Sequence, residues 1–128
     1  MKKVLVVDDQ AFIRQIFMQL IRQIPDTEAM EAENGNAALG KMKVAHPDLV
    51  LLDITMPGKD GLSVLQEMRA DPTLFEIPVI VISAHADQEA HTKELGAKAF
   101  INKVDLNNID LGGIIREFIG VQAEAIAA

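Results

Sequence analysis

The sequence of 128 residues contains no cysteine. Without thiols the chain can form neither a disulfide framework nor a cysteine-based zinc or redox site, and nothing in it favours an oxidising compartment. We therefore expect a cytoplasmic protein. The length and a hydrophobic content of 49% suffice for one domain with a substantial core and leave no room for a second domain of ordinary size.

Long hydrophobic runs and clusters of basic residues are missing as well. The first apolar run follows Lys2 and Lys3 and stops after four residues at Asp8, far short of a signal peptide or a membrane span. The formal net charge is −7, and the lysines and arginines are dispersed along the chain. Such a surface lacks the positive patch that nucleic-acid binding requires. We expect a soluble chain without membrane insertion and without direct contact to nucleic acid.

Four short apolar runs recur along the chain. They are VLVV at 4–7, LVLL at 49–52, VIVI at 79–82 and the weaker AFI at 99–101. Continuous runs of this length are typical of parallel strands that are covered on both faces. A weaker candidate strand, EAMEAE at 28–33, precedes a turn signal at Asn34 and Gly35.

Helical periodicity separates these runs. Apolar residues from Phe12 through Ile16 to Ile24 recur at spacings of three and four, and the pattern stops at Pro25, which predicts an amphipathic helix. Further helices are predicted at 36–45, 61–70, 87–95 and 108–119. Strands and helices thus alternate along the chain. This alternation predicts an α/β fold with a parallel sheet, helices on its faces and right-handed crossovers.

Polar residues follow the predicted strands. Asp8 and Asp9 follow the first strand, Asp53 the third and Ser83 the fourth, and Lys103 comes within two residues of the last. Ligands of open α/β sheets bind outside the carboxyl ends of the strands. If the first and third strands are neighbours, three carboxylates converge there, and each like-charge pair at about 4 Å costs roughly 4 kcal/mol at an effective dielectric of 20. Such a cluster needs a cation, and its oxygen ligands favour Mg²⁺.

Each of these residues has an ordinary interpretation when taken alone. Asp9 or Gln10 can cap the helix that follows. Ser83 can be a cap or turn residue. Lys103 can be a surface lysine, and Asp53 a loop acid. A single site explains their common position more simply than four separate coincidences.

Four motifs in fixed order carry a family resemblance over residues 2 to about 120. They are VLVVDDQ, PDLVLLDITMPGKDG, IPVIVISAH and GAKAFINK. Together they resemble the receiver domain of two-component response regulators, most closely the stand-alone chemotaxis-type receivers. The resemblance implies a flavodoxin-like, five-stranded parallel sheet in strand order 2-1-3-4-5. It also implies a receiver domain at 1–120, followed by a short alanine-rich tail at 121–128.

The resemblance implies a role for each acidic residue. Asp53 would accept a phosphoryl group. Asp8 and Asp9 would hold Mg²⁺ together with Asp53 and the backbone carbonyl of Thr55. The transferring phosphoryl group carries its charge on three oxygens, so positive charge and positioning do most of the work.

Three further residues take roles from the same resemblance. Lys103 would bind one phosphoryl oxygen and Ser83 another. Phe100 matches the aromatic position whose rotation accompanies activation in the family. His85 lies two residues after Ser83, at the rim of the predicted site, where it can influence the access of water to the phosphoryl group.

The implied partners are proteins. A histidine kinase or a histidine-containing phosphotransfer protein would donate the phosphoryl group. The modification would then change the binding of a downstream target on the face of the fourth helix, fifth strand and fifth helix. On this interpretation the chain is a signalling protein that catalyses only its own phosphorylation and dephosphorylation.

One position departs from the family pattern. Lys103 is followed by Val104, where the family usually has a proline joined by a cis bond. A cis bond before another residue costs about 2.5 to 4 kcal/mol. We therefore expect a different peptide geometry at this bond and a distinct shape for the segment that follows.

Two alternative functions stay open at this point. The motif DIT at 53–55 resembles phosphatases of the haloacid dehalogenase type, but the second aspartate of those enzymes is replaced by Thr55. A constitutive interaction module with a vestigial acidic pocket is the other alternative. Loss of Asp53 or Lys103 would favour it, and both are present.

Overall fold

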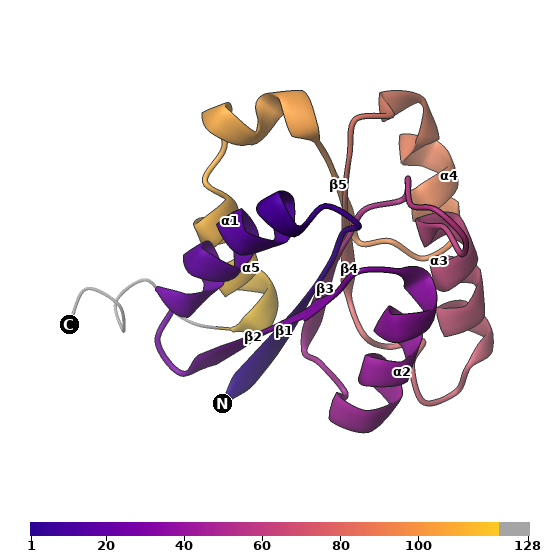
Figure 1. Cartoon of the computed structure of the whole chain (residues 1–128), viewed down its shortest axis with the longest axis horizontal. Coiled ribbons are helices and arrows are strands. Elements are labelled where there is room, and N and C mark those ends of the chain that lie inside the picture. The colour runs from indigo at the N-terminus through magenta and orange to yellow at the C-terminus, as the bar shows by residue number, and fades with distance from the viewer. Residues whose placement is uncertain (121–128) are drawn as a thin grey trace.

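The computed structural model describes residues 1–120, which contain a parallel five-stranded sheet in the order β2-β1-β3-β4-β5 (Figure 1). The strands are β1 (Lys2–Val7), β2 (Thr27–Ala32), β3 (Leu49–Leu52), β4 (Val79–Ser83) and β5 (Ala99–Asn102). This order confirms the predicted flavodoxin-like α/β fold. The predicted tail at 121–128 lies outside the described residues.

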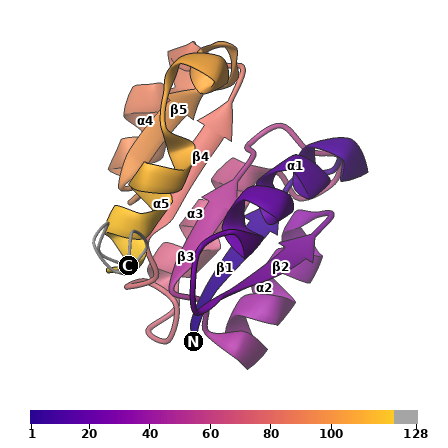
Figure 2. The same ribbon diagram turned by 90° about the vertical axis from the view of Figure 1, so that its left-hand side faces the viewer.

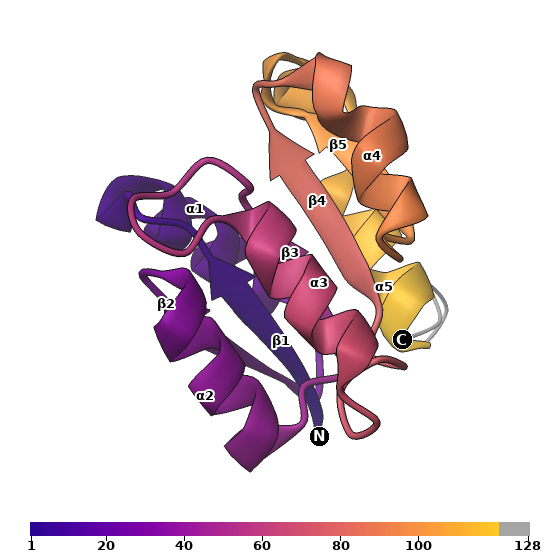
Figure 3. The ribbon, with the colours of Figure 1, turned by 90° about the vertical axis from the view of Figure 1, so that its right-hand side faces the viewer.

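Helices cover both faces of the sheet. They are α1 (Ala11–Arg22), α2 (Gly35–Ala45), α3 (Gly61–Ala70), α4 (Glu89–Glu94) and α5 (Leu111–Ile119), with 3-10 helices η1 (Ala86–Gln88) and η2 (Lys103–Asn108). Helices α1 and α5 lie on one face (Figure 2), and α2, α3 and α4 lie on the other (Figure 3). Among residues 1–120, none of the helices has both the length and the apolar character to cross a bilayer.

The two-sided covering explains the continuous apolar runs. Alternate residues of a strand point to opposite faces of the sheet. In β1, Leu5 and Val7 pack in the cluster with α2 and α3, whereas Val4 and Val6 pack in the cluster with α1 and α5. Both faces of the strand therefore require apolar side chains, and all four of these residues are at most 1% exposed.

Helix α1 is amphipathic as predicted, but two of its apolar residues do not lie on the buried face. Phe12 and Ile16 are 74% and 48% exposed, although the periodicity places them on the buried face. The buried residues of the helix are Arg14, Phe17, Met18 and Ile21. The prediction is wrong at the first turns because a charged residue, Arg14, occupies an inward position there.

Two other helix boundaries differ from the predicted ones. The helix expected at 87–95 is a 3-10 turn, η1, followed by the shorter α4. The helix expected from residue 108 begins at Leu111, because the Asp110 side chain accepts a hydrogen bond from the Gly113 N–H at 3.0 Å and caps it there. The preceding residues form η2 instead.

The Lys103–Val104 bond is trans, as are all peptide bonds among the described residues. The Lys103–Val104 bond therefore differs, as expected, from the cis bond to proline that the family usually has at this position. The Asn102 side chain accepts a hydrogen bond from the Val104 N–H at 3.2 Å, and η2 begins at this point. The distinct segment after β5 thus has a local cause in Asn102.

Candidate functional site

The pairing of β1 with β3 brings two aspartates together. Val7 is in register with Leu52, so Asp8 and Asp53 are the next residues on neighbouring parallel strands. The Asp53 N–H donates to the Val7 carbonyl at 3.0 Å, which continues the ladder by one bond. Both carboxylates therefore emerge at the same edge of the sheet, as the sequence predicts if these two strands are neighbours.

Three carboxylates converge at this edge. One oxygen each from Asp8, Asp9 and Asp53 lies within 4.8 Å of the others. Asp8 and Asp53 are buried, at 2% and 6% exposure, whereas Asp9 is exposed. Hard carboxylate oxygens that leave room for water are the donors that suit Mg²⁺. The residues present thus fit the predicted ion in number, type and position.

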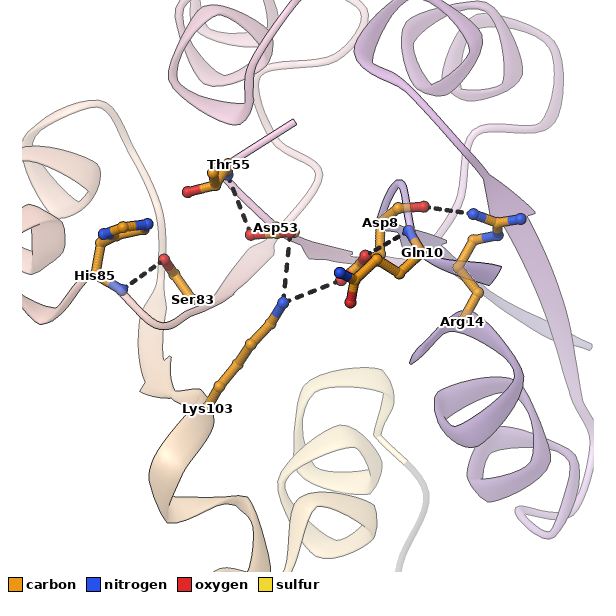
Figure 4. A network of polar contacts seen from close by, with 8 residues as sticks. All are labelled: Asp8, Gln10, Arg14, Asp53, Thr55, Ser83, His85 and Lys103. Carbon is orange, nitrogen blue, oxygen red and sulfur yellow. Dashed lines mark hydrogen bonds and ion pairs between the residues drawn. The ribbon is translucent and has the colours of Figure 1, made fainter. Parts of the chain in front are cut away.

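Lys103, which directly follows the edge strand β5, reaches this cluster from the same carboxyl end of the sheet (Figure 4). Its Nζ lies 3.3 Å from Asp8 Oδ2 and 3.4 Å from Asp53 Oδ2. The trans bond to Val104 therefore does not keep the lysine away from the site. One ammonium group offsets one of three carboxylate charges, so the site retains a net negative charge that attracts a divalent cation.

The Asp53 carboxyl has a raised pKa. Burial is the main cause, because it disfavours the charged form relative to the ordinary pKa of 3.8. The Thr55 N–H, which donates to Asp53 Oδ1 at 3.1 Å, and the Lys103 ammonium group oppose this shift. The neighbouring Asp8 charge adds to it. In the metal-free site burial therefore makes the ionised form of Asp53 less favourable, and a cation would oppose this effect.

Of the two residues considered as the cap of α1, Asp9 does not occupy the N-cap position and Gln10 does. The Gln10 side chain makes no capping hydrogen bond. Asp8 Oδ1 accepts the Gln10 N–H at 2.9 Å, which orders the turn between β1 and α1. Asp9 lies before the cap and stays exposed. The acidic residues are thus free of a helix-capping role.

Ser83 is fully buried at the end of β4. Its Oγ accepts the His85 N–H at 3.0 Å, so the hydroxyl makes the turn contact considered above (Figure 4). The His85 side chain is exposed and borders a groove of about 320 Å³. The groove is also lined by Ile54, Thr55, Met56, Asp60, Leu62 and Gln88. His85 therefore lies beside the loop that follows Asp53.

Phe100 lies in β5 opposite Val81 of β4. It is half-buried and packs against the core cluster on the α2 and α3 side of the sheet. Ser83 pairs with Asn102, two residues along the same strand as Phe100. The two residues with predicted switching roles therefore belong to one strand pair.

Gly61 joins the start of α3 to the backbone that carries Asp53. Its N–H donates to the Ile54 carbonyl at 3.1 Å. A Cβ at this position would lie 2.6 Å from the Asp53 carbonyl oxygen and 2.5 Å from the Ile54 Cα. Only glycine permits this approach, so the β3–α3 loop closes tightly behind the candidate site.

Sequence reasoning misses one residue that touches the site. Arg14 Nη1 donates to the Asp8 carbonyl oxygen at 2.6 Å (Figure 4). Arg14 Nε donates to Glu31 Oε1 at 2.8 Å. The signal is a spacing: Arg14 precedes the buried Phe17 by three residues and Ile21 by seven. A charged side chain on the inward face of a helix needs a buried partner.

Known proteins share both the sequence pattern and the fold. The family model for the response regulator receiver domain matches residues 4–111. The chemotaxis protein CheY of Thermotoga maritima is 40% identical over 105 residues, which cover 80% of this chain and 85% of that protein. A protein-glutamate methylesterase/protein-glutamine glutaminase of Halalkalibacterium halodurans is 38% identical over 106 residues, or 79% of this chain but 30% of that longer protein.

Solved structures agree with this assignment. The response regulator protein TrrA of Thermotoga maritima, in complex with Mg(2+)-BeF, superposes with a TM-score of 0.80 at 31% identity, covering 92% of this chain and 99% of that chain. The phosphorylated cyanobacterial phytochrome response regulator RcpA gives 0.75 at 28% identity, covering 94% and 90%.

The fold and the acidic edge, taken with these matches, define a two-component signalling module. The chain belongs to the response regulator receiver family, and its relatives include chemotaxis proteins of the CheY type. Receiver domains are signalling proteins and in general not enzymes, so the haloacid dehalogenase alternative loses its support.

Proposed function

We propose that this domain accepts a phosphoryl group on Asp53 from a phosphohistidine donor, in a reaction that depends on Mg²⁺. The observation that carries the proposal is the position of Lys103 Nζ, within 3.4 Å of both Asp8 and Asp53 at the edge where three carboxylates meet. A phosphoryl acceptor needs a carboxylate nucleophile beside fixed positive charge, and this edge supplies both.

The transfer exchanges one bond for another. An Asp53 carboxylate oxygen forms a bond to phosphorus as the phosphorus–nitrogen bond of the donor breaks, and the imidazole leaves with the electron pair. Lys103 neutralises a phosphoryl oxygen, and Ser83 donates to another. Asp8, Asp9, Asp53 and the Thr55 carbonyl would hold Mg²⁺, which would supply further positive charge to the phosphoryl oxygens.

The donor needs no general base in this chain, because Asp53 reacts as its carboxylate. Water later attacks phosphorus in line and releases inorganic phosphate, which restores the carboxylate. His85 lies at the exposed rim beside the Asp53 loop and tunes this access of water. The signal is therefore limited in time by the domain itself.

The output is a change in protein binding. Phosphorylation draws Ser83 towards the new oxygens and lets Phe100 turn further into the space beside β4. The surface of α4, β5 and α5 then changes its affinity for a downstream protein target in the cytoplasm. Histidine kinases or histidine phosphotransfer proteins are the donors, and nucleic acid is not contacted directly.

Mass spectrometry tests the proposal. We expect incubation with acetyl phosphate and Mg²⁺ to add one phosphoryl group to the parent protein and none to Asp53→Asn. Asp71→Asn is the matched control, because Asp71 lies outside the candidate site and its carboxylate accepts hydrogen bonds from the nearby Thr73. A phosphoprotein peak undiminished in Asp53→Asn would overturn the assignment. Binding of a partner regardless of phosphorylation would favour the constitutive interaction module.

A further inference from the structure

Arg14 is a charged residue on the inward face of α1. Its side chain is 11% exposed and forms an ion pair with Glu31 of β2, whose side chain is 36% exposed. The guanidinium group also donates to the Asp8 carbonyl oxygen at 2.6 Å, in a buried hydrogen bond. One side chain thus connects α1, β2 and the end of β1.

The carbonyl that Arg14 holds belongs to the peptide between Asp8 and Asp9. Val7 is the last residue of β1, so this carbonyl lies beyond the paired strand. A peptide group is planar, and the direction of its carbonyl therefore sets the direction of the next residue. Holding the Asp8 carbonyl consequently constrains the position of the Asp9 Cα, from which the Asp9 carboxylate extends.

Glu31 compensates the charge of Arg14, so the contact between Arg14 and the Asp8 carbonyl acts mainly through its geometry. An arginine so close to an acidic cluster would repel a cation if its charge were uncompensated. Glu31 Oε1 accepts from Arg14 Nε at 2.8 Å and compensates that charge. The planar fork of the guanidinium group presents several donors in fixed directions, so one nitrogen can pair with Glu31 while another holds the carbonyl.

We infer that Arg14, oriented by Glu31, is a positioning residue for the divalent cation. It holds the peptide between Asp8 and Asp9 so that both carboxylates face Asp53. The inference rests on the proposed function, because it presumes that the acidic edge binds Mg²⁺. Contacts behind metal ligands typically change metal affinity by about 10- to 100-fold when they are removed.

A role of Arg14 as a nearby charge and a role in positioning predict different Mg²⁺ affinities for Arg14→Met and Arg14→Lys. If Arg14 acted only as a nearby positive charge, Arg14→Met would increase the affinity for Mg²⁺, and Arg14→Lys would leave it unchanged. A positioning role predicts weaker binding in both, because methionine has no donor and lysine lacks the planar fork. A purely structural role lowers the melting temperature without changing Mg²⁺ affinity well below the melt.

The experiment is a Mg²⁺ titration followed by amide chemical shifts in NMR, with thermal melts of each metal-free variant. We expect the dissociation constant to rise about tenfold in Arg14→Met and by a smaller factor in Arg14→Lys. Arg116→Met is the matched control. Arg116 pairs with Asp110 at 3.6 Å on α5, and its loss should not weaken Mg²⁺ binding.

The outcomes distinguish a failure of the positioning role of Arg14 from a failure of the proposed phosphoacceptor function. A dissociation constant that is unchanged or lower in either folded Arg14 variant overturns the positioning role and leaves the phosphoacceptor proposal standing. A parent protein that binds no Mg²⁺ overturns both together. Binding weakened in Arg116→Met as much as in Arg14→Met would show that the Arg14 effect is non-specific, and it would overturn the positioning role alone.

Discussion

Lys103 Nζ lies 3.4 Å from Asp53 Oδ2, although 50 residues separate the two in the chain. The lysine follows β5, and the aspartate follows β3, with β4 between them in the sheet. The contact therefore spans an intervening strand, and only a long side chain can make it. This relationship places a positive charge beside the candidate phosphoacceptor.

Replacing this lysine should separate metal binding from phosphoryl transfer. We expect Lys103→Gln to slow phosphorylation by acetyl phosphate about a hundredfold, because a charge that stabilises the transition state is lost. Mg²⁺ binding should be retained or strengthened, because the competing ammonium group is gone. Phosphorylation kinetics and a Mg²⁺ titration check both expectations. Loss of Mg²⁺ binding would show that the lysine organises the carboxylates instead.

Asp9→Ala should weaken Mg²⁺ binding and stabilise the metal-free protein. Asp9 contributes one of three converging carboxylates and lies outside the N-cap of α1, so its removal relieves repulsion without uncapping the helix. We expect a gain of less than about 1 kcal/mol, because the side chain is exposed. Thermal melts with and without Mg²⁺ measure it. A less stable metal-free variant would contradict the repulsion argument.

The raised pKa of Asp53 predicts a pH dependence of stability in the metal-free protein. A raised pKa means that the folded state binds the proton more tightly, so the stabilisation is complete below the ordinary value of 3.8 and is lost as pH rises through the raised pKa. Asp53→Asn cannot ionise. We therefore expect it to be more stable than the parent near neutral pH.

Urea unfolding with a chelator at several pH values tests this dependence. The advantage of Asp53→Asn should shrink as the pH approaches the ordinary pKa of the carboxyl group, because the parent then carries the proton as well. A difference that stays constant over this range would mean that contacts other than ionisation cause it.

Two glycines should respond oppositely to alanine. In Gly61→Ala the new Cβ would meet the Asp53 carbonyl oxygen at 2.6 Å, so we expect a loss of about 1 to 3 kcal/mol and shifted NMR signals at the site. Gly40 lies inside α2 with open space around it, so Gly40→Ala should gain about 0.5 to 1 kcal/mol. Chemical denaturation measures both, and equal effects would contradict the steric argument.

The coupling of Ser83 to Phe100 can be tested with beryllofluoride. A phosphoryl group replaces one negative charge by roughly two and adds strong acceptors, which gives the Ser83 hydroxyl a partner other than the His85 N–H. We expect Ser83→Ala to bind the mimic with weaker chemical-shift changes at Phe100 and residues 87–119. A full response in this variant would exclude the serine as the link, because a modification shifts an equilibrium only through differential interactions.

The local sequence determined the elements and the residues at their ends. Runs such as VLVV and LVLL predict buried parallel strands because both of their faces must be apolar, and the structure confirms four such strands near their predicted positions. The residues that end these runs are the ones that meet at the candidate site. Family motifs were readable for the same reason, since the acidic pair, Asp53 and Lys103 each sit next to a recognisable strand.

Tertiary structure alone decided which surfaces are buried and which distant residues touch. Periodicity placed Phe12 inward, yet it is 74% exposed. The orientation of α1 depends on how the helix packs on the sheet, and in that packing Arg14 takes an inward position. Arg14 itself could not be assigned, because its partners are a backbone carbonyl and Glu31, 17 residues away on β2. Local patterns record spacing along one element, whereas such contacts depend on the order and register of strands, which long-range packing sets.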